Sequence, residues 1–164
     1  MTALAAPALV APALVAPRAA LVYYDQQRVT LPRPLGPVEA WNRIMANPLP
    51  GMGLAFRLRD AISARFGVQR IGGFSGRKVT EPRVGERLDF FLVEGLSAEQ
   101  MVLTARDRHL DVMISVDVAG AELAITASVV THNRFGRAYM LPVAPAHRLI
   151  VWLMLRRLKA SLGS

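Results

Sequence analysis

The middle of the chain alternates apolar and polar residues over five consecutive segments, a pattern typical of β-strands. The clearest segment is 109–119, where every even position from Leu110 to Val118 is apolar. Strict alternation buries one face of a strand and leaves the other face wet. The five predicted strands cover residues 72–79, 86–94, 99–107, 109–119 and 122–133. Turn residues separate neighbouring segments at Gly95, Arg108 and Gly120. We therefore expect antiparallel hairpins.

Before this run, the sequence predicts one strand and two helices. Residues 20–31 form the strand, and two prolines stop it. The first helix covers 37–47, with Pro37 at its first position. The second covers 50–66, with a stop at Gly67. Its apolar residues recur every four positions and predict a buried stripe, formed by Leu54, Leu58, Ile62 and Phe66.

After the run, the sequence predicts a last short strand over 137–141 and then a terminal helix. Pro142 and Pro145 precede this helix, which we expect over 145–162. Residues 149–155 are apolar without a gap, and basic residues flank them. This run is typical of a helix buried between a sheet and a partner, and an interfacial membrane helix is the alternative.

The element order predicts an α+β, helix-grip (START-like) fold. A curved antiparallel sheet of about seven strands would wrap around the long C-terminal helix, with two short helices after the first strand and a cavity between sheet and helix. We expect a single domain over residues 20–164. An Ala/Pro-rich arm, residues 1–19, precedes it and repeats Ala-Pro-Ala-Leu-Val at 6–10 and 11–15. Regular prolines exclude a continuous helix there, so the arm is either flexible or laid across an apolar surface of the domain.

The formal net charge of +8 is unevenly distributed. Residues 123–164 contain six basic residues and no acid. Because 18 of the 20 basic residues are arginine, codon bias explains much of this excess, and we expect no nucleic-acid partner. The chain has no cysteine, which excludes disulfides and fits a cytoplasmic location. It has no typical export signal and no apolar run long enough for a transmembrane span.

Four sequence blocks resemble a known family. They are Leu58-Arg59-Asp60, 107–111 (Asp-Arg-His-Leu-Asp), 132–139 (His-Asn-Arg-Phe-Gly-Arg-Ala-Tyr) and 145–151 (Pro-Ala-His-Arg-Leu-Ile-Val). Together they resemble the signature of a bacterial family of domains of unknown function, which is similar to the START-type, polyketide-cyclase-like (SRPBCC) superfamily. The resemblance covers about residues 21–160 and implies a helix-grip fold with a cavity. It also implies an oxidoreductase partner, because some relatives are fused to a nucleotide-binding reductase domain. Ala146 departs from the family, which usually has an aromatic residue there.

Asp107, His109 and Asp111 form the first candidate site. Their i, i+2, i+4 spacing puts them on one side of a straight strand, where they would bind a divalent metal or another ligand, or pair a base with its orienting group. Alternatively, Asp107 belongs to a turn and both carboxylates pair with arginines. Because the apolar residues of the strand face the core, this trio should face solvent. No fourth ligand is evident, so we expect no metal site.

His147 is the strongest single candidate. On a helical wheel it lies on the face with Val151, the stripe expected to meet the sheet. In the first turn of a helix, the dipole would keep its imidazole neutral. A structural histidine bonded to Tyr139 is the alternative. Further ligand-binding candidates are Arg59 and Arg137, whose guanidinium groups suit an anion, and Asn133 at a strand end.

These features support three functional hypotheses. The first is a binding protein for a hydrophobic, optionally anionic, small molecule, with no cofactor. The second is a cyclase-, isomerase- or hydratase-type enzyme acting on a hydrophobic carbonyl compound, with His147 and Tyr139 transferring protons. The third is an interaction protein whose basic C-terminal helix contacts a membrane, an acidic partner or a second copy in a homodimer. In that hypothesis, Trp152 lies among cations on the face away from His147, and Trp152→Ala should alter association more than ligand occupancy.

Overall fold

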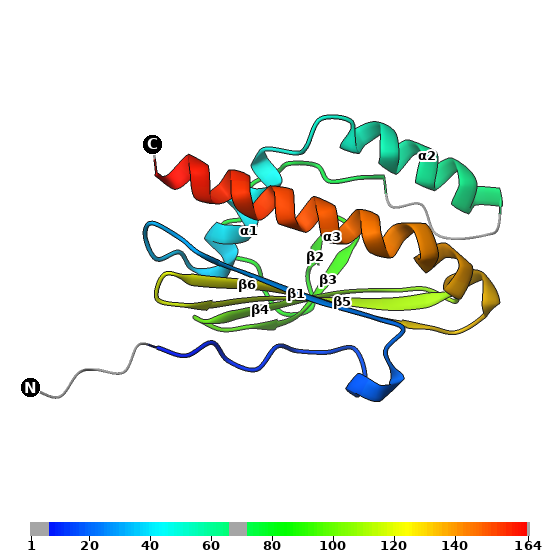
Figure 1. The fold of residues 1–164 in the computed structure, drawn as a ribbon, viewed down its shortest axis with the longest axis horizontal. Helices are drawn as coiled ribbons and strands as arrows, with labels where there is room; N and C mark the ends of the chain where they lie inside the picture. Colours follow the sequence, from blue (N-terminus) through cyan, green and yellow to red (C-terminus); the bar gives the residue numbers. More distant parts are fainter. Residues whose placement is uncertain (1–6, 66–71, 164) are drawn as a thin grey trace, which may run out of the picture.

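The computed structural model describes residues 7–65 and 72–163, without the side chains of Leu58 and Ile62. It is an α+β structure with one open antiparallel sheet and a long C-terminal helix (Figure 1). The strands follow the order β1-β6-β5-β4-β3-β2 across the sheet. Their bounds are β1 Tyr23–Thr30, β2 Arg87–Leu88, β3 Phe91–Leu96, β4 Gln100–Arg106, β5 Leu110–Ala119 and β6 Glu122–Thr131. The helices are α1 Pro37–Ala46, α2 Met52–Arg65 and α3 Arg134–Leu162, with a 3-10 turn η1 at Arg18–Ala20.

The sheet has six strands, so the predicted number of about seven is wrong. Residues 72–79 form no strand, because Gly72, Gly73 and Gly76 have φ angles of 71°, 81° and 68°. Backbone in this left-handed region cannot continue an extended strand. The predicted strand 86–94 is instead a hairpin of β2 and β3, with Asp89 at positive φ between them.

The second missing strand, 137–141, belongs to α3. This helix begins eleven residues earlier than 145, because Asn133 caps it by accepting the Gly136 N–H at 2.9 Å. Pro142 and Pro145 lie inside the helix rather than before it. Each removes one N–H donor, and the carbonyls left without it belong to exposed residues that water can reach. The end of the helix at Leu162 agrees with the prediction.

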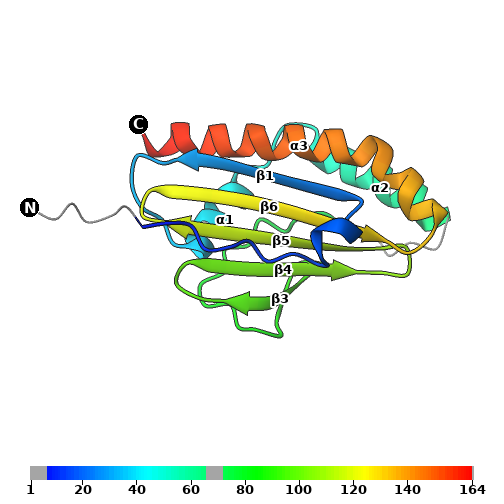
Figure 2. The same cartoon turned by 60° about the horizontal axis from the view of Figure 1, so that its bottom comes forward.

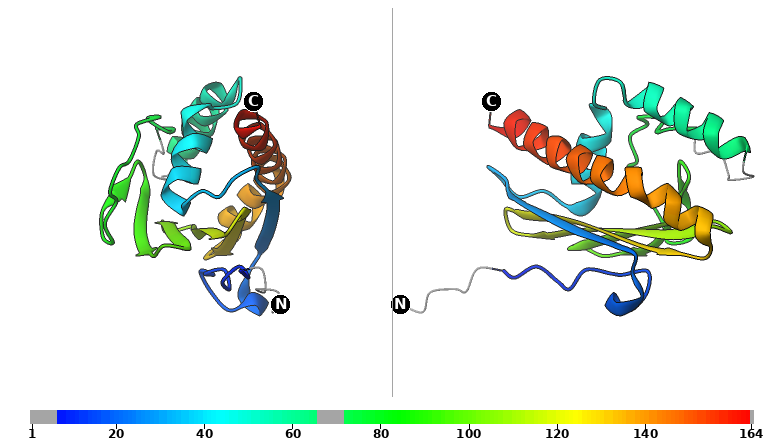
Figure 3. Two further views of the ribbon diagram at one scale, coloured as in Figure 1. Left: turned by 90° about the vertical axis from the view of Figure 1, so that its left-hand side faces the viewer. Right: turned by 45° about the vertical axis from the view of Figure 1, so that its right-hand side comes forward.

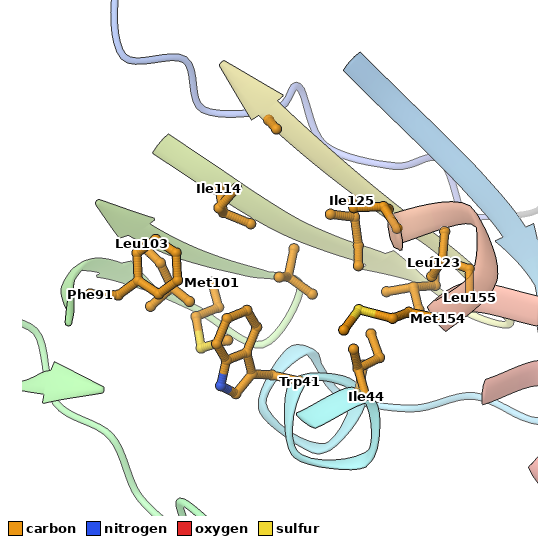
Figure 4. Packing of buried hydrophobic residues seen from close by; sticks show 14 of the residues in the cluster. Trp41, Ile44, Phe91, Met101, Leu103, Ile114, Leu123, Ile125, Met154 and Leu155 are labelled. Atoms are coloured by element: carbon orange, nitrogen blue, oxygen red, sulfur yellow. The ribbon is translucent and has the colours of Figure 1, made fainter. Parts of the chain in front are cut away.

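The core lies between the inner face of the sheet and helices α1 and α3. Both helices cover this one face of the sheet (Figure 3). Figure 4 shows Met154 and Leu155 of α3 beside Leu123 and Ile125 of β6. From α1, Trp41 packs edge-on against Phe91 with ring centroids 5.9 Å apart. The apolar positions predicted for β5 thus face the core, as the alternation requires.

Helix α2 lies farther from the sheet than α1 (Figure 1). Leu54 is 70% exposed, so the predicted buried stripe does not include it. The other members of that stripe, Leu58, Ile62 and Phe66, lie outside the described residues or side chains. Met52 and Ser63 are buried, and Phe56 packs against Phe74. The inward face of α2 therefore begins two residues before the leucine stripe.

The centre of the sheet's outer face is not exposed to solvent, because the N-terminal arm covers it (Figure 2). Three hydrogen bonds fix the arm to three strands. The Ala13 N–H donates to Ser115 Oγ on β5 at 3.2 Å, and the Val15 N–H donates to Ser128 Oγ on β6 at 3.0 Å. The Ala11 carbonyl accepts from Gln100 Nε2 on β4 at 3.0 Å. The surface beneath the arm is polar, with fully buried serine and threonine side chains.

Asp117 is the one acid buried beneath this part of the arm among the described residues. One carboxylate oxygen accepts from Gln100 Nε2 at 2.8 Å and from Ser115 Oγ at 2.7 Å. The other oxygen is buried and has no hydrogen-bond partner in the described structure. Burial therefore raises the pKa of this carboxyl above its ordinary value, and the two hydrogen bonds oppose that rise.

Candidate functional site

A cavity of about 610 Å³ lies between the inner face of the sheet and the three helices. This volume is within the range of small-molecule sites, which is about 300–1,000 Å³. Its wall is mainly aromatic and aliphatic and includes Trp41, Phe56, Phe90, Phe91, Ile125 and Met154. The aromatic side of this wall comes from α1, α2, the segment with Phe74, and the β2–β3 hairpin. A molecule enclosed here would contact mostly apolar surface.

Tyr23 and His147 form one polar corner of the cavity. The Tyr23 hydroxyl oxygen lies 3.4 Å from His147 Nδ1, and the two rings meet edge-on with centroids 5.9 Å apart. Burial lowers the pKa of His147, although the nearby Asp25 carboxylate opposes this. Burial and the same carboxylate raise the pKa of Tyr23 to about 12. Both groups are therefore neutral near pH 7.

Neutrality defines what this corner offers a ligand. When the Tyr23 hydroxyl donates to His147 Nδ1, the imidazole carries its hydrogen on Nε2, which is then a donor. The opposite tautomer leaves Nε2 as an acceptor. In both cases the corner presents one uncharged hydrogen-bonding group in an apolar wall. It suits a carbonyl or hydroxyl oxygen.

Contacts between β1 and α3 hold His147 in place. Asp25 accepts from Arg148 Nε at 3.0 Å, and Gln27 Nε2 donates to the Arg148 carbonyl at 2.8 Å. Both contacts involve the residue directly after His147. They fix this turn of α3 against β1 and so fix the direction of the imidazole. Arg148 remains largely exposed on the outer side of the helix.

Arg59 and Tyr139 form a second polar corner, between α2 and α3. Arg59 Nε donates to the Tyr139 hydroxyl oxygen at 2.9 Å, and Arg59 Nη1 pairs with Asp60 at 2.9 Å. Tyr139 and His147 are eight residues apart on α3, which separates them by about 12 Å along the axis. The two predicted proton-transfer groups therefore share the cavity wall but do not meet. Each pairs with a different residue.

The trio of Asp107, His109 and Asp111 does not form one site. Asp107 accepts the N–H groups of His109 and Leu110 at 2.6 and 2.9 Å, as a turn residue does, and it also borders the cavity. Asp111 pairs on the outer face with Arg106 at 3.3 Å and with His132 at 3.1 Å. The prediction that the trio faces solvent is wrong for His109, which is 8% exposed. Among the described residues, no cluster of three or more His, Asp or Glu could hold a metal ion.

His109 and Asn133 support the start of α3. The imidazole packs at a tilt against the Phe135 ring, with centroids 4.8 Å apart, and its Nδ1 lies 2.9 Å from Asn133 Nδ2. Asn133 also caps the helix. Neither residue lines the cavity. Arg137 lies outside it as well, beside a separate depression of about 310 Å³.

Sequence analysis missed Tyr23 and the aromatic wall. Tyr23 begins β1 as a buried residue, and it pairs with Val129, which also lines the cavity. Because side chains alternate along a strand, the inward direction of Tyr23 was accessible from the apolar pattern of β6 once the pairing was known. The wall depends on the distance between helices and sheet, which carries no local sequence signal.

Comparison with known proteins adds a family to this geometry. Neither the curated proteins nor the solved structures gave a significant match. Residues 18–154 match the family described as "Protein of unknown function (DUF2867)". The match begins within the arm, at η1, and includes the cavity and most of α3. The chain therefore belongs to the DUF2867 family of proteins of unknown function.

Proposed function

We propose that this protein binds a hydrophobic small molecule in the cavity between the sheet and α3. The observation that carries the proposal is an apolar cavity of about 610 Å³ with polar groups confined to two corners. The His147 corner suits a carbonyl or hydroxyl oxygen. At the Arg59 corner the guanidinium is already paired with Asp60, and its N–H donors together with the Tyr139 hydroxyl suit a second polar group of the ligand. The ligand class is thus an elongated, mostly apolar molecule with a polar group near one or both ends.

The proposal includes a cytoplasmic location and kinship with the bacterial START-type domains. The order of elements supports the kinship, because the sheet and terminal helix are compatible with a helix-grip arrangement. Ala146 supports a roomy site: it borders the cavity at the position where the sequence resemblance leads us to expect an aromatic residue. A larger side chain at this position would enter the space that the ligand needs.

Ala146→Phe tests the proposal directly. The probe is anilinonaphthalene sulfonate, a dye with an apolar body and one anionic group. Its fluorescence in the cavity should saturate with one dye per chain, and Ala146→Phe should weaken this binding about ten-fold or more. Ala138→Phe is the matched control, since Ala138 is exposed on the same helix and does not line the cavity. Equal dye binding by both variants and the native chain would overturn the proposal.

Mass spectrometry of the natively purified protein identifies the ligand. A single co-purified compound that is lost from Ala146→Phe and retained by Ala138→Phe would support the cavity as its site. The Trp152→Phe variant adds an optical readout, because it leaves Trp41 in the cavity wall as the only tryptophan. Its emission should change when the ligand binds.

A second candidate is an isomerase-, cyclase- or hydratase-type enzyme acting on a hydrophobic carbonyl compound. The observation that favours it is the neutral His147 beside Tyr23, since a neutral imidazole in an apolar cavity is suited to general acid–base catalysis. In this candidate the His147 imidazole exchanges a proton with the substrate, and the Tyr23 hydroxyl orients the imidazole. Activity that survives in His147→Gln would refute the role of this imidazole.

A further inference from the structure

The exposed side of α3 has an unusual composition for a surface helix. Leu141 is 77% exposed, Leu149 56% and Trp152 45%. On a helical wheel these residues fall within one face, and they span about 16 Å of the helix axis. The opposite side of α3 packs on the sheet through Val151, Met154, Leu155 and Leu158. Leu141, Leu149 and Trp152 therefore form an exposed apolar strip that takes no part in packing the core.

Cations surround this apolar strip. Helix α3 carries six basic residues and no acid: Arg134, Arg137, Arg148, Arg156, Arg157 and Lys159. Within the part of the chain that the structure describes, only Arg148 among them forms an ion pair with a carboxylate. The Arg156 guanidinium lies over the Trp152 ring, 4.6 Å from its centroid. This contact holds the indole on the surface beside a positive charge.

The depression beside Arg137 continues the strip. Its volume is about 310 Å³, and Val22, Met140, Leu141 and Ala144 line it together with Arg137. Val22, directly before β1, is itself an exposed apolar side chain. An apolar hollow next to an arginine suits the combination of an acyl chain and an anionic headgroup.

We propose that this face of α3 docks on an anionic membrane surface. Tryptophan and leucine among arginine and lysine are typical of helices that lie in the membrane interface. A second copy is a poorer partner, because a two-fold contact would place acid-free, positively charged faces against each other. The strip is a ridge along one helix, and a deformable lipid interface accommodates a ridge without a shaped groove.

The docked helix lies along the membrane and does not cross it. The sequence predicts no apolar run long enough to span a membrane, but α3 begins at Arg134 and is therefore longer than predicted; among the described helices it alone is long and apolar enough to cross a bilayer, by length and composition only. However, its inward residues belong to the protein core, and spanning would require α3 to leave the sheet. Only its outward face is available. The proposal is independent of what the cavity binds.

Vesicle flotation with the full chain tests the proposal. The vesicles contain phosphatidylcholine alone or with one third phosphatidylglycerol. We expect binding to the anionic vesicles, little binding to the neutral ones, and loss of binding as salt shortens the range of the charges. Trp152→Ala should weaken binding about ten-fold, and Trp152→Phe should retain most of it.

Matched variants separate this surface from general charge and hydrophobicity. Arg137→Gln combined with Lys159→Gln should weaken binding about twenty-five-fold, since each surface cation contributes roughly a factor of five. Arg77→Gln combined with Arg83→Gln removes the same charge elsewhere and should leave binding unchanged, as should Val84→Ala for exposed apolar area. All the substituted side chains are exposed, and circular dichroism verifies that each variant folds.

Several outcomes overturn the proposal. They are no flotation with anionic vesicles, equal loss of binding in the control variants, and equal binding to neutral and anionic vesicles. If Trp152→Ala changes only the sedimentation of the protein without vesicles, the strip is a contact between protein chains and the membrane proposal is wrong.

Discussion

Gly136→Ala tests the structure at the start of α3. Gly136 is buried in the first turn of the helix, where it passes the turn that contains His109. An added Cβ would overlap the His109 carbonyl oxygen and lie 3.2 Å from both the His109 carbonyl carbon and Thr131 Cβ. The carbonyl cannot move freely, because it accepts the His132 N–H at 2.8 Å. The substitution must therefore shift backbone, not a flexible side chain.

The structure gives the size of the effect. Overpacking against backbone costs about 1–3 kcal/mol. Displacing α3 weakens the Asn133 cap on Gly136, worth about 1 kcal/mol, and the His132 hydrogen bond, worth about 1 kcal/mol. Alanine returns about 1 kcal/mol through its higher helix propensity. We expect a net loss of about 2–4 kcal/mol, a large fraction of the stability of a small domain.

Urea denaturation followed by far-UV circular dichroism measures this loss. Gly53→Ala in α2 is the control, because no atom lies within 4 Å of its added Cβ and its φ is not positive. It should leave stability unchanged or raise it by up to about 1 kcal/mol, through the same gain in helix propensity. If Gly136→Ala unfolds at the same urea concentration as the native chain, the close approach of α3 to the His109 turn is refuted.

Three further predictions concern groups that are buried or covered. Because burial lowers the pKa of His147, the unfolded chain takes up its proton first, so stability should fall as pH drops below about 6.5; melting curves of His147→Gln should show a weaker fall, and parallel curves would contradict this. Because burial raises the pKa of Asp117, the native chain carries an unfavourable buried charge at high pH; Asp117→Asn should raise the melting temperature more at about pH 8 than at about pH 4, and the reverse order would exclude this cause. Ser128→Ala removes the acceptor of the Val15 N–H, which should then exchange its hydrogen about five-fold faster or more in exchange experiments; unchanged exchange would show that this bond does not hold the arm.

The strands from β4 to β6 were predictable because their signals are local, whereas Gly95, predicted as a turn, lies inside β3. Apolar alternation identifies the inward face of β5, and Gly120 marks the turn to β6, which pairs with β5 from Leu110 to Ala119. The long C-terminal helix and its end were also predictable. The number of strands was not, because the three glycines of 72–79 adopt positive φ in a segment whose composition resembles a strand.

The start of α3 had a local signal that the prolines obscured. Asn133 is a preferred N-cap residue three positions before a buried glycine. Pro142 and Pro145 suggest a boundary, yet their positions on the exposed side allow the helix to continue. For the site, the helical wheel directs His147 to the sheet, where it lines the cavity. Its partner Tyr23 could not be identified in this way, because it meets His147 through the contact between β1 and α3, and the two residues are 124 positions apart in sequence.

The repeat in the arm has five residues, an odd number, whereas contacts with the sheet recur at every second residue. Ala11, Ala13 and Val15 bond to the sheet, and the same odd-numbered series leads back to Pro7, which lies against Gly120. The two repeats therefore present opposite positions to the same surface and are not interchangeable. Deleting residues 6–10 keeps the bonded series intact. Inserting a single residue after Pro17 reverses the parity and directs Leu14 to the serines, so the arm tolerates the loss of five residues better than the gain of one.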